Sequence, residues 1–200
     1  MSQKRGYQLK RRAERQDETR RRITTATAAL HEEIGPAATT ISAIAERAGV
    51  ERLTVYRHFP DEIELYRACQ RHFLDEHPFP NLRAWAETPE PTARLRRALC
   101  ELYARYGETE AMTANILRDA PSMPALAATL EGMPAFYRAA RELLAEGFSA
   151  APTPRPLLLA AIGHALDFET WRSLARRQGL ADEQTVELMV DFITGLAAAG

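Results

Sequence analysis

The fold is decided by residues 39–59, which read TTISAIAERAGVERLTVYRHF. Thr39 or Thr40 can cap a short helix with apolar residues at helical spacing, and Gly49 ends that helix after about two turns. A second short helix follows and stops at Pro60. Small and apolar side chains on the two helices can pack them together: Ile44, Ala45, Val50, Val55 and Phe59. Two short helices joined by a glycine turn predict a helix-turn-helix.

The second helix of this pair carries a polar face that suits DNA. We expect its outward side chains to be Arg52, Thr54, Tyr56, Arg57 and His58. Arginine can donate two hydrogen bonds to guanine in the major groove, and a threonine methyl group can contact the methyl group of thymine. Tyrosine, threonine and histidine can donate hydrogen bonds to phosphates, which fixes the register of a protein on the duplex. The helix pair therefore predicts binding to double-stranded DNA.

The charge of the chain is unevenly divided. The whole chain has a net charge of −1 at pH 7, but residues 1–22 hold 9 basic and 3 acidic side chains, a net charge of +6. Residues 1–16 are polar and basic and lack apolar periodicity, so we expect a flexible arm, followed by a helix that Asp17 caps. A basic end on an acidic body favours a polyanionic partner, although a solubilising tail has the same composition.

Composition excludes several classes of protein. With 200 residues, of which 46% are hydrophobic and 26% charged, the chain can bury a core and is not expected to be disordered. Its longest apolar run, 157–163, is too short to span a bilayer, and no signal peptide follows the basic N-terminus. Cys69 and Cys100 are far apart, which argues against a disulfide scaffold. We therefore expect a soluble, cytoplasmic protein with no membrane partner.

Enzyme and cofactor motifs are missing from the sequence. It contains no GxSxG, no HExxH and no Walker loop. His164 and Asp167, three residues apart, would form only half of a metal site. We expect no catalytic residue, no cofactor and no metal.

The remainder of the chain reads as helical, which predicts an all-α fold. Prolines and glycines divide it into segments, and no alternating pattern is long enough for a strand. We expect helices at 61–77, 91–106, 108–119, 122–148, 155–178 and 182–198. Because Pro78 and Pro80 mark a boundary, four parts are predicted: a flexible basic arm (1–16), a helix-turn-helix domain (17–60), a connecting helix (61–77) and a larger C-terminal domain (78–200).

Over residues 18–77 the sequence resembles the TetR family of bacterial transcriptional regulators. The resemblance lies in TTISAIAERAGVERLTVYRHFPDEIELYRA, residues 39–68. It implies an N-terminal three-helix DNA-binding domain and a helical C-terminal domain that dimerises and binds a small effector. The residues that it assigns to phosphates are Thr40, Tyr56 and His58. Those that it assigns to base edges are Arg52, Leu53 and Thr54, with Arg57 in or beside the groove.

Two positions depart from the family pattern. A phosphate-contacting lysine is usual near the start of the fourth helix, where this chain has Glu62, whose carboxylate repels phosphate. We expect three arginines of the basic arm to compensate: Arg11, Arg12 and Arg15. Ile41, at a position that contacts DNA in some members, has no hydrogen-bonding group to offer a base.

Two apolar helices of the C-terminal domain predict a homodimer. Residues 157–162 are apolar around a full helical turn, and a second stripe runs along 186–197. We expect both helices to pair with their symmetry mates; the alternative is that they form the core of a monomer. A two-fold dimer would place two recognition helices ~34–36 Å apart on an inverted repeat.

Candidate effector contacts are scattered over the C-terminal domain. They are Trp85, Tyr103, Tyr106, Met112, Asn115, Ile116, Phe136, Tyr137, Phe168 and Trp171. Ligand sites are mostly apolar with a few polar anchors, but for any single aromatic residue core packing is the more common role. Asn115 could hold a ligand, cap a helix or reach solvent. We predict a repressor released from a palindromic operator by a small hydrophobic or aromatic effector; the alternative is an architectural or constitutive DNA-binding protein without an effector.

Overall fold

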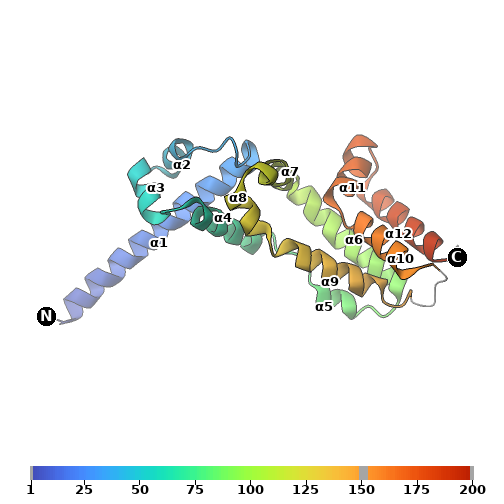
Figure 1. Ribbon diagram of the computed structural model, residues 1–200. Coiled ribbons are helices and arrows are strands. Elements are labelled where there is room, and N and C mark those ends of the chain that lie inside the picture. Colours follow the sequence, from blue (N-terminus) through green and yellow to red (C-terminus); the bar gives the residue numbers. More distant parts are fainter. Residues whose placement is uncertain (1, 149–152, 199–200) are drawn as a thin grey trace. The chain divides into compact units, whose positions relative to one another are not determined.

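The computed structural model describes residues 2–148 and 153–198 (Figure 1). Met1 of the predicted arm and residues 149–152 and 199–200 of the predicted C-terminal domain lie outside the described residues. The fold is all-α as predicted, with no strand in the described ranges. The chain forms two compact units: an N-terminal unit of residues 1–78 and 111–130, and a C-terminal unit of residues 79–110 and 131–200.

Four helices form the first part of the N-terminal unit: α1 (Ser2–Glu33), α2 (Ile41–Ala48), α3 (Arg52–His58) and α4 (Glu62–Glu76). Their buried faces share one apolar core, made of Ile23, Ala26, Leu30, Ile44, Ala45, Ala48, Val55, Phe59, Leu65 and Ala68. The expected packing of the two short helices is confirmed, and Val50 also packs against this core. Ile34 lies beyond the end of α1 and is exposed.

Helix α1 begins much earlier than the sequence suggested. We expected a helix start at Asp17 after an irregular segment, but α1 is helical from Ser2 (Figure 1). The expected start was wrong because apolar periodicity marks only helices that cover a core. Residues 10–22 include six arginines and two glutamates, which favour helix, and the first proline is Pro36. The buried positions of α1 begin only at Ile23.

A second segment of the chain completes the N-terminal unit. It contains α7 (Glu110–Asp119), a 3-10 turn (Ala120–Ser122), α8 (Pro124–Ala127) and a further 3-10 turn (Ala128–Leu130). Tyr66 of α4 is buried together with Ala120 and Leu126 of this segment, and Gln70 Nε2 donates to the Thr129 carbonyl oxygen at 2.6 Å. The single helix expected over 122–148 was wrong, because short turns precede α9, which begins at Met133.

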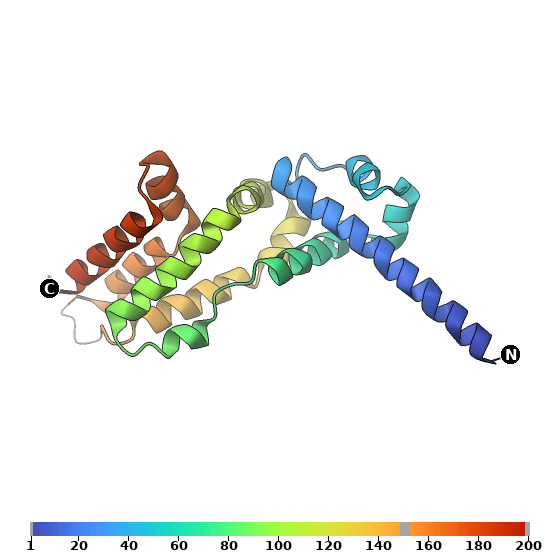
Figure 2. The same ribbon diagram turned by 180° about the vertical axis from the view of Figure 1, so that it is seen from behind.

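The C-terminal unit is a helical bundle (Figure 2). Its elements are α5 (Leu82–Ala86), α6 (Pro91–Glu108), α9 (Met133–Ala145), α10 (Arg155–Ala165), α11 (Phe168–Arg172), a π-helical turn (Ser173–Arg177) and α12 (Asp182–Ala198). The helix expected over 155–178 is broken at Asp167, whose carboxylate accepts a hydrogen bond from the Glu169 amide at 2.7 Å and starts α11. Helix α12 matches its expected range of 182–198.

None of the helices in the described ranges is both long enough and apolar enough to cross a membrane.

Candidate nucleic-acid interface

The turn between α2 and α3 is built as its sequence predicts. Thr40 Oγ1 accepts a hydrogen bond from the Ala43 amide at 3.1 Å and caps α2. Gly49 has φ +63°, a left-handed conformation that a residue with a side chain rarely adopts, and its amide donates to Glu46 O. The Val50 amide donates to Ala45 O at 2.9 Å and closes the turn. Thr40 therefore uses an acceptor site of its hydroxyl for capping, which leaves the hydroxyl proton free to be donated.

Helix α3 packs against the core on one side and is exposed on the other. Val55 and Phe59 are buried in the apolar core, so the opposite face points outward. Leu53 is 71% exposed and Tyr56 48% exposed. Arg52 and Arg57 are also exposed, whereas Thr54 and His58 are half-buried. The six predicted DNA contacts of this helix thus lie around one accessible face or at its edge.

Two arginines of α1 hold the C-terminal ends of α2 and α3, and sequence reasoning missed both. Arg22 donates to the carbonyl oxygens of Ala48 and Gly49, the latter at 3.0 Å. Arg20 donates to His58 O at 2.5 Å and stacks its guanidinium 4.1 Å from the centre of the Phe59 ring. A cation is favourable at a helix C-terminus, where the last carbonyls lack partners. The sequence gives no signal that separates Arg20 and Arg22 from solvated arginines, because both lie within a basic run.

The electrostatics of α3 favour a neutral His58. Partial burial lowers the pKa of His58, and the neighbouring Arg20 and Arg57 guanidiniums lower it further. Arg57 Nη2 also donates to Thr54 Oγ1 at 3.3 Å, so the Thr54 hydroxyl has a neighbour on the same helix face. A neutral imidazole can still donate one hydrogen bond to a phosphate.

Glu62 and the three arginines expected to compensate for it are exposed on two different helices, α4 and α1. Glu62 is exposed in the first turn of α4, directly after Asp61, whose carboxylate caps the helix by accepting from the Glu64 amide at 2.7 Å. Arg11, Arg12 and Arg15 are exposed on the part of α1 that precedes its first buried residue.

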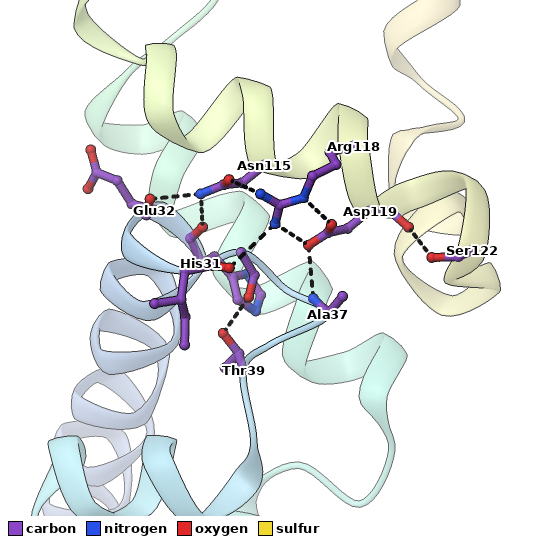
Figure 3. Close-up of polar contacts among 10 residues, drawn as sticks. His31, Glu32, Ala37, Thr39, Asn115, Arg118, Asp119 and Ser122 are labelled. Carbon is purple, nitrogen blue, oxygen red and sulfur yellow. Dashed lines mark hydrogen bonds and ion pairs between the residues drawn. The ribbon is translucent and has the colours of Figure 1, made fainter.

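The candidate effector residues fall into both units. Met112, Asn115 and Ile116 belong to the N-terminal unit, and the other seven belong to the C-terminal unit. Asn115 Nδ2 donates to the carbonyl oxygens of His31 and Glu32 at 3.0 and 2.8 Å, so its amide caps α1 (Figure 3). The role of this side chain is thereby accounted for within the fold.

The aromatic residues of the C-terminal unit are close together. Tyr103 and Tyr106 donate to the carbonyl oxygens of Ala165 and Leu166 at 2.8 and 2.6 Å, and the Tyr106 and Tyr137 hydroxyls lie 3.0 Å apart. Burial raises the pKa of all three phenols. Further ring contacts extend this group to Trp85, Phe136, Phe168 and Trp171.

Two polar groups near these rings differ in how they are satisfied. Trp85 Nε1 donates to Glu101 Oε2 at 2.7 Å, whereas the buried Trp171 Nε1 has no hydrogen-bond partner among the described residues.

His164 Nδ1 lies 3.1 Å from Thr170 Oγ1. Across residues 2–148 and 153–198, no group of three or more His, Cys, Asp or Glu is arranged to hold a metal ion.

Comparison with known proteins agrees with this geometry. Residues 23–69 match the family model of bacterial regulatory proteins, tetR family. No curated protein matches the sequence. Among solved structures, a tetR-family transcriptional regulator from Streptomyces coelicolor aligns with a TM-score of 0.61 at 18% identity, covering 88% of this chain and 81% of that one. A TetR-like transcriptional regulator from Rhodococcus sp. RHA1 gives 0.64 at 20% identity, covering 90% and 96%.

A protein from Mesorhizobium loti has the same fold, with a TM-score of 0.65 at 18% identity over 91% of this chain and 98% of that one. At such low identities these structures establish the shared fold, and the matched segment 23–69 contains α2, α3 and part of the helices that pack against them. Residues 23–69 are thus similar to the tetR family of bacterial regulatory proteins, and the chain shares the fold of the TetR-family regulators compared with it.

Proposed function

We propose that the protein is a homodimeric repressor that binds an inverted-repeat operator and leaves it when a small hydrophobic or aromatic effector binds. The observation that carries this proposal is the accessible face of α3, which presents Arg52, Leu53 and Tyr56 from a helix anchored by Val55 and Phe59. A rigid helix that offers hydrogen-bond donors and one apolar side chain suits the major groove.

Each exposed residue of the helix pair takes a role that fits its chemistry. Arg52 reads guanine, while Leu53 and Thr54 contact base edges beside it. Tyr56 and His58 donate hydrogen bonds to phosphates, and Arg57 lies in or beside the groove. Thr40 donates its hydroxyl proton to a phosphate at the N-terminus of α2, where the helix dipole also favours an anion. The cationic side chains Arg11, Arg12 and Arg15 add contacts to the backbone that do not depend on sequence.

Exposed apolar side chains on α10 and α12 support a homodimer. Leu157 on α10 is 51% exposed, and Leu188 and Phe192 on α12 are 44% and 47% exposed. Leu188, Phe192 and the open position Gly195 follow one another at helical spacing and form one stripe on α12. The opposite side of α12 is buried at Val186, so this stripe is available to a second copy of the chain.

Aromatic side chains of the C-terminal unit supply the chemistry for an effector. Trp171 Nε1 is a buried donor without a partner among the described residues, and a ligand oxygen would satisfy it. In the proposed switch, the effector shifts α4 and changes the spacing of the two recognition helices. This requires that the effector bind the DNA-incompetent state more tightly. Helix α4 is suited to this role because it ends at Glu76, just before the limit of the N-terminal unit at Pro78.

The test is a titration of purified protein onto DNA from upstream of its own gene and onto random DNA, at two salt concentrations. We expect tight binding to the upstream DNA that survives the higher salt, with a footprint on an inverted repeat. Equal and strongly salt-sensitive binding to both DNAs, together with failure to select any preferred duplex from a random pool, would contradict the proposal.

A second candidate function is that of an architectural DNA-binding protein without an effector. The hydrogen bonds that tie Tyr103 and Tyr106 to the end of α10 favour it, because they are typical of a filled core. A thermal-shift screen with lipophilic and aromatic compounds separates the two functions. Stabilisation by one chemical class, followed by loss of operator affinity with the same compound, supports the repressor. An effector that binds and leaves operator affinity unchanged would contradict the switch.

A further inference from the structure

The C-terminal end of α1 is capped by side chains from a distant part of the sequence. Asn115 Nδ2 donates to His31 O and Glu32 O, and Arg118 Nη2 reaches Ile34 O at 3.4 Å (Figure 3). The Asn115 side chain is itself held in place, because Arg118 Nη1 donates to its Oδ1 at 2.8 Å. Carbonyls of the last turn of α1 thus accept hydrogen bonds from α7, and His31 O accepts a second one from the Gly35 amide.

Asp119 extends this contact to the loop between α1 and α2. Its carboxylate accepts from the Ala37 amide at 3.0 Å and from Arg118 Nε and Nη2 at 2.6 and 3.0 Å (Figure 3). The side chain is buried, and the Arg118 guanidinium and the Ala37 amide hold the pKa of Asp119 below its ordinary range. We call Asn115, Arg118 and Asp119 the clasp.

Gly35 shows how closely the clasp fits the loop. A Cβ atom at Gly35 would lie 2.1 Å from Arg118 Nη2 and 2.7 Å from Asp119 Oδ2, and the residue has φ +89°. From Gly35 the contacts continue toward α2, because Thr39 Oγ1 donates to Gly35 O at 2.8 Å and the Thr39 amide donates to Pro36 O. The next residue, Thr40, is the cap of α2.

We propose that the clasp residues are positioning residues for DNA binding. By fixing the loop 34–39 they set where α2 begins relative to α1, and therefore where the reading face of α3 lies. The DNA-binding head is then built from two separate stretches of chain, 1–78 and 111–130, although none of the clasp residues touches DNA. This inference rests on the proposed function, because it takes α3 to be the reading helix.

Two mild substitutions in the full-length protein test the inference. Arg118→Lys keeps the positive charge but loses the planar fork that bonds Asp119 and Asn115 together. Asn115→Ala removes the donor to the two carbonyls and leaves Arg118 and Asp119 in place. The matched control is Arg96→Lys, because Arg96 forms a comparable forked pair with Glu187 in the C-terminal unit, at 2.7 and 2.8 Å.

Each variant is measured in two ways, well below its melting temperature. One measurement is the affinity for a duplex selected from a random DNA pool by the wild-type protein, compared with the affinity for unselected DNA. The other is amide hydrogen exchange over residues 34–48. We expect both clasp variants to lose about tenfold in affinity for the selected duplex, with unselected DNA bound as before. The exchange of the Ala37 amide and of the first turn of α2 should be faster, and Arg96→Lys should change neither quantity.

The outcomes separate the inference from the function on which it rests. Clasp variants that retain full preference for the selected duplex would overturn the inference, even if their exchange is faster. If the wild-type protein selects no duplex, the proposed function fails, and unchanged exchange at Ala37 in both variants would then overturn the positioning of the loop as well. A loss that affects selected and unselected DNA equally would also overturn it, because general unfolding of the head weakens both.

Discussion

Arg52 is the exposed arginine at the first position of α3, and it tests direct reading of the operator. We expect Arg52→Ala to abolish discrimination at one base pair, at a cost of ~1–3 kcal/mol, because the forked pair of hydrogen bonds to guanine can no longer form. The measurement is the affinity of wild type and variant for the operator and for operators substituted at single positions. Equal loss on operator and on random DNA would show instead that Arg52 contacts a phosphate.

His31 makes the stability of the N-terminal unit depend on pH. Burial lowers the pKa of His31 to about 4 from 6.5, against the carboxylate of Asp119, which raises it. The unfolded chain therefore gains a proton on His31 as the pH falls below 6.5, while the folded chain does not do so until about pH 4. Between pH 7 and pH 5 the free energy of unfolding should fall by about 2 kcal/mol from this group.

The titratable groups around His31 have pKa values shifted away from the range between pH 5 and pH 7, so they do not add to this pH dependence. Burial raises the pKa of Cys69 to about 12, burial and Glu62 raise the pKa of Tyr66, and Arg118 lowers the pKa of Asp119. Urea unfolding at the two pH values should therefore show a smaller loss in His31→Leu than in wild type. The control is His164→Leu, at an exposed position of α10. A variant with the full wild-type pH dependence would contradict the assignment to His31.

The contact between α1 and α3 carries a prediction at the scale of elements. Arg20→Ala removes the hydrogen bond to His58 O and the stacking on Phe59, so we expect a loss of about 1–2 kcal/mol in stability. The pKa of His58 should rise at the same time, because the Arg20 guanidinium is one of the causes that lower it. A nuclear magnetic resonance titration of His58 measures this rise, and Arg21→Ala serves as a control on the same helix. An unchanged His58 titration would show that Arg20 does not act on α3 electrostatically.

The N-terminal part of α1 gives a second prediction at this scale. Deleting residues 2–15 should weaken binding to operator and to random DNA by similar factors, because exposed arginines contact phosphates without reading sequence. The slope of log affinity against log salt should become shallower by about 0.9 for each phosphate that the shortened helix no longer neutralises. Replacing Arg11, Arg12 and Arg15 by glutamine keeps the helix and should reproduce most of the effect. A loss confined to the operator would contradict this role.

At the scale of elements, the predictions that proved correct rest on local signals. The cap at Thr40, the turn at Gly49 and the start of α4 at Asp61 each depend on a few neighbouring residues, and all three were predicted. The return of residues 111–130 to the N-terminal unit depends on contacts such as that of Tyr66 with Leu126, which no local pattern shows. The roles of Arg20 and Arg22 also depend on contacts between distant segments, and a capping arginine cannot be distinguished from a solvated one in the sequence.

For the molecule as a whole, the proposed dimer has the clearest test. We expect Leu188→Glu and Phe192→Glu to give monomers, because each places a charge on the apolar stripe of α12. Operator affinity should fall when the dimer is lost, since two linked recognition helices bind more tightly than one. Light scattering across a range of concentrations measures the mass. Leu117→Glu, on an equally exposed leucine of α7, is the control and should remain dimeric. Dimers in both α12 variants would exclude this surface.

The candidate sites of the whole molecule were predictable to different degrees. The exposed residues of α3 could be named because a helix-turn-helix fixes which positions point outward once Val55 and Phe59 are buried. The effector residues could not be separated from core residues, because burial is the same for both, as at Tyr103 and Trp171. Asn115 illustrates the limit: a polar residue in an apolar helix suggested a ligand, and the structure pairs it with the end of α1.

The two-segment head has a consequence for synthesis on the ribosome. When residue 78 has been made, α1 to α4 are present, but Asn115, Arg118 and Asp119 do not yet exist. At ~5–20 residues per second, residue 130 follows roughly 3–10 seconds later. Throughout that interval the nascent chain carries the arginine-rich α1 and the exposed face of α3 without the clasp. The head therefore matures late, and a transcript broken off between these points yields a basic fragment that lacks the part of the chain that orders its first loop.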